Sequence, residues 1–263
     1  MDNFGPYDSH TETSGVFHFN RAYFIDGPQQ VVGPILDFGR LGYKSSQPDL
    51  ISGNIEFRVS SDKLVYAPID GIVEKIGWHS SGGQHADWDD WGISIKPLAD
   101  RRPPSPLGNA PPPNTWLVEI DHVVSLDCPR PRVMPEICDT PLTLEGEEIK
   151  PGREIKAGQI LGYVGNLADY GKTGLNGRVE IQINRTTDDW WVTEGHCPIL
   201  FLDKDVSSIW TVAIENYMSD YETWADNTEI YDENNMVVPG CNYSNVTYDQ
   251  STGTKYASQE WVK

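Results

Sequence analysis

The chain has 263 residues, and its 39 acidic residues outnumber its 20 basic ones, which leaves a formal net charge of -19. A field of this sign repels nucleic-acid phosphates and anionic lipids, so we expect no nucleic-acid partner. The 9 Trp, 12 Tyr and 7 Phe residues and the 38% hydrophobic content are too rich for a disordered chain. With 24 Gly and 19 Pro, turns are frequent, and the composition favours a β-rich protein.

Composition divides the chain into three parts. Residues 1–30 predict an irregular extension, residues 31–200 a β domain, and residues 201–263 a helix and a tail that pack on it. Within the β domain, short β-branched and apolar runs end at Gly, Pro, Asp or Ser, which is typical of strands. The expected strands cover residues 31–38, 54–59, 63–67, 71–76, 92–95, 116–120, 160–165 and 178–184.

Three further segments separate or follow these strands. The proline-rich run 100–114 cannot donate a continuous ladder of hydrogen bonds and predicts an exposed loop. Residues 123–141 predict a loop that a disulfide closes. Apolar side chains recur every three or four residues from Val206 to Trp224, which predicts an amphipathic helix that packs on the sheet.

The four cysteines form no CxxC pair of the kind that zinc ribbons and redox motifs use. We therefore expect disulfides and a secreted or cell-surface location, the alternative being four free thiols in a cytosolic protein. Sequence neighbourhood favours pairing Cys128 with Cys138 and Cys197 with Cys241. No apolar run approaches the ~20 residues of a membrane span, and residues 1–4 lack signal-peptide features, so a secretion signal would have been removed.

Two segments predict a strand, a tight turn and a second strand. In residues 65–73 the Asp70-Gly71 pair predicts a hairpin turn with positive φ, and in residues 149–165 Gly152 and Gly158 predict successive turns. Together the two segments resemble the paired motifs of the lysostaphin-like, LytM-type zinc endopeptidases, over about residues 33–184. The resemblance implies a mainly β, lysostaphin-like barrel-sandwich core (a duplicated hybrid motif), followed by the one C-terminal helix. No lysine stands at the first turn, which excludes a biotinyl or lipoyl carrier.

The resemblance also implies a zinc site, whose residues this chain replaces. In the family, two His and one Asp hold the zinc, and further His orient the attacking water. Ser52 and Glu56 stand here at the first His and Asp positions, and Arg178 and Glu180 stand at the two His positions of the last strand. Only His122, in the element midway, matches the family pattern.

These replacements predict a vestigial site at His122, Ser52 and Arg178. Residues two apart in a strand share a face, so Arg178 is expected to lie between Glu56 and Glu180 and to replace the charge of a metal ion. No cofactor is then required. The alternative is an oxygen-rich metal site of Glu56, Glu180 and His122, which would take zinc or calcium.

Two aromatic clusters are candidate ligand-binding surfaces. Trp88 and Trp91 lie in an acidic segment downstream of His79 and His85, which predicts an ordinary loop or, alternatively, a calcium or sugar site. Trp190 and Trp191 form either an interface patch or a core anchor.

The leading functional prediction is a non-catalytic extracellular or cell-surface module for binding or assembly. Its partners would be a glycan, a peptide or another protein, and self-assembly is compatible with it. The rival hypothesis is a divergent metallohydrolase, a peptidase with a non-standard metal site. Metal analysis separates the two, because only the second requires tightly bound zinc.

Overall fold

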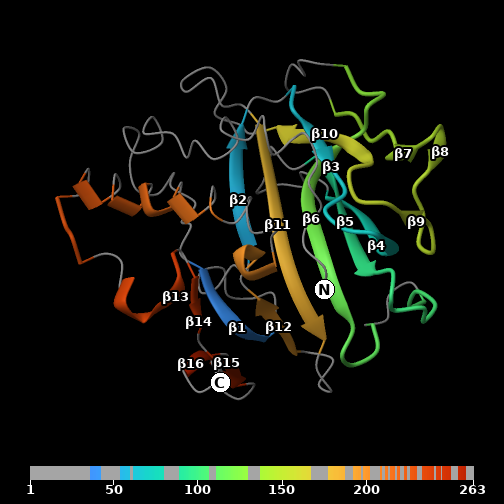
Figure 1. Cartoon of the computed structure of the whole chain (residues 1–263). Coiled ribbons are helices and arrows are strands. Elements are labelled where there is room, and N and C mark those ends of the chain that lie inside the picture. Colours follow the sequence, from blue (N-terminus) through green and yellow to red (C-terminus); the bar gives the residue numbers. More distant parts are fainter. Residues whose placement is uncertain are drawn as a thin grey trace.

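The fold is that of a computed structural model of the chain (Figure 1). The structure describes residues 36–42, 54–59, 62–79, 89–106, 111–129, 137–166, 177–186 and 192–196 and, with gaps, residues 198–258. The expected extension over residues 1–30 lies outside these ranges. The boundaries of the three expected parts stay a prediction.

The described residues are mainly β, as expected. The first six strands are β1 (Leu36–Gly42), β2 (Asn54–Val59), β3 (Leu64–Tyr66), β4 (Gly71–His79), β5 (Asp90–Pro97) and β6 (Trp116–Val124). The next six are β7 (Thr143–Leu144), β8 (Glu147–Glu148), β9 (Glu154–Ile155), β10 (Ile160–Asn166), β11 (Gly177–Thr186) and β12 (Val192–His196). The last four are β13 (Met236–Val238), β14 (Cys241–Tyr243), β15 (Asn245–Asp249) and β16 (Thr254–Ser258). Two short 3-10 helices cover Pro198–Phe201 and Glu233–Asn235.

One large sheet organises the fold. Its strands follow the order β13-β14-β1-β12-β11-β10-β6-β5-β4-β9, with β2 paired to β11 and β3 paired to β10. The long strands β11 and β6 also pair with each other and run through the middle of the molecule (Figure 1). Each predicted strand overlaps an observed one, and β4, β5 and β6 are longer than expected.

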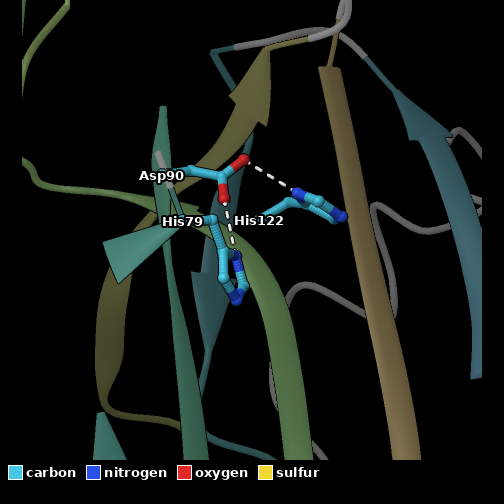
Figure 2. Close-up of side chains that lie close together, drawn as sticks. All are labelled: His79, Asp90 and His122. Carbon is cyan, nitrogen blue, oxygen red and sulfur yellow. Dashed lines mark hydrogen bonds and ion pairs between the residues drawn. The ribbon is translucent and has the colours of Figure 1, made fainter. Parts of the chain in front are cut away.

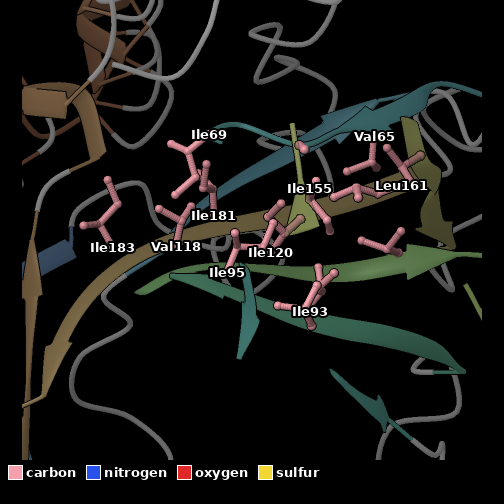
Figure 3. Close-up of a cluster of buried hydrophobic side chains, with 14 of the residues drawn as sticks. Val65, Ile69, Ile93, Ile95, Val118, Ile120, Ile155, Leu161, Ile181 and Ile183 are labelled. Carbon is pink, nitrogen blue, oxygen red and sulfur yellow. The ribbon is translucent and has the colours of Figure 1, made fainter. Parts of the chain in front are cut away.

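The hydrophobic core lies on one face of the central strands. In register, Ile120 of β6 opposes Ile93 of β5 and Ile181 of β11, and Val118 opposes Ile95 and Ile183. All six of these side chains are buried and point into one cluster (Figure 3). Because side chains alternate along a strand, the residues between them face the other way. That second face carries polar residues, among them Ser94, Glu119 and Gln182.

The two family-like segments pair with each other, which corrects the hairpin expected at Asp70-Gly71. Strand β3 pairs with β10, whereas β4 pairs with β5 and β9. Gly71 has no positive φ; it is glycine because a Cβ there would lie 2.3 Å from Ile95 Cγ2 and 2.5 Å from the Lys96 carbonyl oxygen. The turns predicted at Gly152 and Gly158 are confirmed, with φ of 92° and 83°.

The C-terminal part contributes a helix and edge strands. Described residues between 208 and 223 are helical, and Ile214 and Met218, one turn apart, are buried in the core cluster. The predicted amphipathic helix is therefore confirmed over its described residues. Beyond it, β14 adds to the sheet by pairing in parallel with β1.

A disulfide joins Cys128 and Cys138, as predicted. Strand β6 continues to Val124, so the loop that this bond closes begins later than expected. The expected pairing of Cys197 with Cys241 stays a prediction, because Cys197 lies outside the described residues. None of the described helical segments combines the length and apolar composition that crossing a bilayer needs.

The proline-rich loop is anchored by a buried ion pair. Lys96 Nζ lies 3.3 Å from Glu74 Oε2, and the two side chains are 1% and 2% exposed. Lys96 also donates to the Arg102 carbonyl oxygen, and Glu74 Oε1 accepts a 2.6 Å hydrogen bond from the Ser105 backbone N–H. The loop is exposed over much of its described length, as predicted. Its backbone forms hydrogen bonds with the buried charged groups of Lys96 and Glu74.

We expect Lys96→Met to lower the free energy of unfolding by about 3–5 kcal/mol, because it leaves the buried Glu74 carboxylate without its counter-charge. The matched control is Arg101→Met, which removes an ion pair with Glu154 whose side chains are 66% and 64% exposed. That change should cost about 0–1 kcal/mol. Urea unfolding of both variants is the measurement, and equal losses would contradict the anchoring role of the pair.

Candidate metal centre

Two histidines and an aspartate converge on the polar face of the sheet, opposite the core. His79 ends β4 and Asp90 begins β5, and the two are direct cross-strand partners. His122 comes from β6, the next strand (Figure 2). Three consecutive strands, β4, β5 and β6, therefore hold the three residues. The β4–β5 and β5–β6 pairings are among the longest in the fold.

The Asp90 carboxylate lies between the two imidazoles. Its Oδ2 lies 2.8 Å from His122 Nδ1 and its Oδ1 lies 3.1 Å from His79 Nδ1, both hydrogen-bond distances (Figure 2). Asp90 and His122 are buried, whereas the His79 side chain is 34% exposed. Solvent therefore reaches the cluster from the His79 side.

A β-bulge aims His122 at this cluster. Trp91 of β5 opposes Val123 and Ile93 opposes Ile120, so Gly92 faces two residues of β6, Asp121 and His122. His122 has a φ of 68°, a left-handed conformation that is uncommon for residues with a side chain. Because of this bulge, neighbouring side chains that would otherwise alternate both reach the polar face.

Two glycines leave the space that the cluster fills. A Cβ on Gly165 would lie 2.8 Å from both Asp90 Oδ2 and His122 Cβ. A Cβ on Gly92 would lie 2.4 Å from Asp121 Oδ1 and 2.8 Å from His79 Cε1. Any larger residue at either position would displace the functional groups, so both glycines are part of the site.

Two further carboxylates face the outer nitrogens of the imidazoles. Glu180 Oε1 of β11 lies 3.4 Å from His122 Nε2, and Asp121 Oδ1 lies 3.8 Å from His79 Nε2. Asp121 and Glu180 are cross-strand partners, and Gln182 donates a 3.1 Å hydrogen bond to the second oxygen of Asp121. The cluster and these two neighbours together contain two imidazoles and three carboxylates.

The electrostatics of the two aspartates differ. Burial raises the pKa of Asp90, but hydrogen bonds from His122 and His79 outweigh burial, so its pKa lies below the ordinary value. Burial raises the pKa of Asp121, and the nearby charges of Glu180 and Asp90 add to this rise against the opposing effect of the histidines. Asp90 is therefore held ionised, and the outer carboxylates repel one another in the absence of a cation.

This arrangement fits a divalent metal ion. One ligand atom each of His79, Asp90 and His122 lies within 4.8 Å of the others. Imidazole nitrogens and carboxylate oxygens are the usual zinc ligands. Calcium, which prefers six to eight oxygen ligands, suits two imidazoles less well.

The structure places the residues singled out from the sequence as follows. His122 lies in the cluster, and Glu180 lies beside it. The register of β2 and β11 pairs Glu180 with Glu56 and Arg178 with Arg58. The structure does not describe the side chains of Glu56 and Arg178. Ser52 is also outside it. The proposed replacement of a metal charge by Arg178 therefore stays a prediction.

Sequence reasoning noted His79 but did not join it, with Asp90, to His122. The interpretation of that segment as an ordinary loop is wrong for Asp90 and Trp91, which belong to β5. The available signal was hairpin spacing, because two strands that flank a loop bring their ends together; the pairing of His79 with Asp90 is set by the register of β4 and β5. The bulge that redirects His122 left no recognisable pattern in the sequence.

Trp91 packs against its neighbours. Its ring is half-buried against the core, stacks edge-on with Trp78 at 5.1 Å between ring centroids, and donates a 3.1 Å hydrogen bond to the Thr140 carbonyl oxygen. Its assignment as a ligand-binding aromatic stays a prediction. Trp88, Trp190 and Trp191 lie outside the described residues.

Comparison with solved structures finds several that align with part of this chain. The catalytic domain of the antimicrobial peptidase lysostaphin from Staphylococcus simulans aligns with 14% identity over 62% of this chain and 91% of its own length, with a TM-score of 0.33. The catalytic domain of the prophage-encoded protein EnpA from Enterococcus faecalis aligns with 16% identity over 63% of this chain and 96% of its own, with a TM-score of 0.32.

The structure of whole lysostaphin aligns over 66% of this chain with 14% identity and a TM-score of 0.34, and the chain spans 53% of that protein. No family model and no curated protein sequence matches the chain. The likeness to these structures is one of fold alone.

We expect Gly165→Ala to disturb the cluster. The added methyl group would press on Asp90 and His122, and overpacking of this kind costs about 1–3 kcal/mol. Gly77→Ala is the matched control in β4, because a Cβ there meets nothing within 4 Å. Chemical unfolding and the imidazole NMR signals of both variants are the readouts. Unchanged imidazole signals in Gly165→Ala would contradict the close packing of Gly165 against Asp90 and His122.

A further prediction concerns Glu119, which lies on the same polar face as Asp121. Burial, and then the charge of Asp121, raise the pKa of Glu119 from 4.5 to about 7. Because the pKa of Glu119 is higher in the folded than in the unfolded protein, protonated Glu119 favours the folded state. This contribution is complete below the unfolded pKa of about 4.5 and is lost as the pH rises through about 7. Glu119→Gln should therefore flatten the decline in unfolding free energy over that window.

The measurement is urea unfolding at several pH values across that window. Asp127→Asn, at an exposed position in the same region of the chain, is the control and should follow the wild-type profile. Parallel profiles for Glu119→Gln and the wild type would show that Glu119 ionises normally.

Proposed function

We propose that this chain binds a divalent metal ion, most suitably zinc, at the His79–Asp90–His122 cluster and acts as a metal-dependent hydrolase. The observation that supports this proposal is the convergence of two imidazoles and a carboxylate within 4.8 Å on the polar face. Two further features are typical of functional sites. The pKa values of Asp90 and Asp121 are shifted, and His122 has an unfavourable left-handed backbone conformation.

The chemistry follows from the metal and its surroundings. A bound zinc ion supplies Lewis acidity, which lowers the pKa of a bound water to about 7 and polarises a substrate carbonyl. The chain's own residues hold and orient this centre: Asp90 fixes the two rings, and the bulge fixes His122. His79, at 34% exposure, forms the side through which a substrate approaches.

The bond that we propose is cleaved is a peptide amide. This choice follows the sequence resemblance to LytM-type endopeptidases, and the site differs from theirs in using His79 and Asp90. An extracellular location accords with the Cys128–Cys138 disulfide, because such bonds persist in oxidising compartments.

A second candidate is the non-catalytic binding or assembly module, with a glycan, a peptide, a protein or a second copy of the chain as partner. The observation that favours it is that Asp90 already accepts hydrogen bonds from both imidazoles. Such an arrangement is stable without an ion. The residues at the family's histidine positions, Ser52 and Arg178, point the same way.

Metal analysis and a hydrolysis assay on the same preparation test both candidates. Protein purified without chelator should carry about one zinc ion per chain. It should also cleave members of a fluorogenic peptide panel that includes glycyl-glycine bonds, and lose cleavage on dialysis against a chelator. His122→Asn should lower both metal content and activity, whereas Asp127→Asn, at an exposed position, should lower neither.

The outcomes separate the candidates. Bound metal with cleavage supports the hydrolase. Bound metal without cleavage of any peptide contradicts the hydrolase and favours a binding module with a structural metal. Protein that takes up no zinc even when it is supplied in excess contradicts the metal centre itself.

A further inference from the structure

Beside the proposed metal centre, we infer a subsite on the polar face of the sheet that binds a primary ammonium group of a peptide substrate, through Glu119 and Asp121 of β6 and Asn184 of β11. This inference rests on the proposed function and deepens it, because it names a class of substrate: peptides with a free amino group close to the scissile bond. The amino group would belong to a lysine-like side chain or to the N-terminus of the peptide.

The subsite lies one step along the strand from the metal centre. Asp121 Oδ1 lies 3.8 Å from His79 Nε2, and Glu119 is two residues from Asp121 on the same face of β6. Two residues of a strand span about 6.6 Å, which is also about the length of two residues of an extended peptide. An ammonium group at Glu119 would therefore belong to a residue within about two positions of the cleaved bond.

Two glycines leave the sheet uncovered beside these carboxylates. Gly77 of β4 and Gly92 of β5 are direct cross-strand partners, and Gly77 is two residues from His79 on the same face. A Cβ on Gly77 would meet nothing within 4 Å, so the space above it is open. Gly92 adjoins Asp121, because a Cβ there would lie 2.4 Å from Asp121 Oδ1. An extended peptide can therefore lie over the two glycines and reach Asp121 with a side chain or its N-terminus.

The amide side chains on this face pass their N–H groups to one another and to the carboxylates. Asn184 Nδ2 donates a 3.3 Å hydrogen bond to Gln182 Oε1, and Gln182 Nε2 donates a 3.1 Å hydrogen bond to Asp121 Oδ2. The Asn184 side chain also hydrogen-bonds Glu119. This network therefore ends on two carboxylates, and its acceptors outnumber its donors.

The excess of acceptors is clearest at Asn184. The residue is 5% exposed, and its Oδ1 accepts no hydrogen bond from any residue that the structure describes. Buried polar atoms are normally satisfied by protein, water or a ligand, because an unsatisfied one is costly. Its side-chain neighbours Glu119 and Gln182 already receive the Asn184 N–H groups. The donor that this part of the face lacks therefore has to come from outside the network.

The charges around Glu119 favour a donor that is also a cation. Burial, and then the charge of Asp121, raise the pKa of Glu119 to about 7. The hydrogen bond from Asn184 and the charge of Lys75, an exposed residue of β4, oppose this rise without cancelling it. An ammonium group between Glu119 and Asp121 would reduce the repulsion between the two carboxylates and favour the ionised form of both.

The arrangement of the acceptors selects the kind of cation. An ammonium group carries three N–H donors that point in different directions, so it can serve acceptors on β6 and β11 together. A guanidinium group is planar and pairs best with both oxygens of a single carboxylate. The net charge of -19 attracts organic cations of both kinds to the protein, and the spread of the acceptors over two strands favours the ammonium group.

Binding of matched peptides to the full chain tests the subsite directly. The first pair is an acetylated glycine peptide amide with one lysine and the same peptide with norleucine, which keeps the aliphatic chain without the charge. The second pair is tetraglycine amide with a free and with an acetylated N-terminus. Calorimetry, in the presence and absence of a chelator, gives the affinities. We expect the ammonium-bearing peptide of at least one pair to bind about 10- to 100-fold more tightly than its partner, and the pair that responds identifies the source of the group.

Variants locate the preference on the sheet. Glu119→Gln keeps the shape of the side chain and removes its charge, so it should reduce the affinity for the ammonium-bearing peptide to about that for its neutral partner. Asp121→Asn should reduce the preference in the same direction. Asp127→Asn, at an exposed position, should keep the wild-type preference. The comparison of peptides on the wild type needs no variant to fold.

The outcomes separate this inference from the proposed function. Equal affinities within both pairs overturn the subsite, and they leave the hydrolase in place if the protein cleaves the peptide panel. A preference for ammonium-bearing peptides in a protein that cleaves none of them supports the subsite and contradicts only the hydrolase. A preference that persists unchanged in Glu119→Gln overturns the assignment of the subsite to Glu119.

Discussion

The Asp90 carboxylate, held between two imidazoles, is the interaction on which the candidate site depends. A buried carboxylate is costly unless hydrogen bonds compensate it, and here His79 and His122 supply them. The same bonds fix both rings. Removing Asp90 would therefore release both histidine side chains. Removing either histidine would leave the buried Asp90 carboxylate with only one of these two hydrogen bonds.

The rest of the fold supports this interaction from the opposite face of the sheet. Alternation places Ile93, Ile120 and Ile181 in the core and sends their neighbours to the polar face. Burial of such side chains stabilises the strands by about 1.5–3 kcal/mol each, which offsets the strain of a left-handed His122. The site thus uses rigid strands, with glycines where side chains would intrude.

Much of the fold was predictable because its signals are local. Short apolar runs, the turns at Gly152 and Gly158, and the nearby Cys128–Cys138 pair were each confirmed. The site was less predictable because it depends on register. His122 was identified, but its partners come from a hairpin end and from a bulge, and a shift of one residue moves every side chain to the other face. Glu56 and Arg178 were predicted from the positions of the family's ligands, whereas this chain carries its two imidazoles on β4 and β6.

We propose that the polar face of the sheet holds a metal ion at the imidazoles of His79 and His122. A crystal structure of the zinc-soaked protein, with anomalous data recorded at the zinc absorption edge, tests it most directly. We expect an anomalous peak within bonding distance of both His79 and His122. A zinc-soaked crystal with no peak at this cluster, or with its peak between Glu56 and Glu180 away from His79, would contradict it.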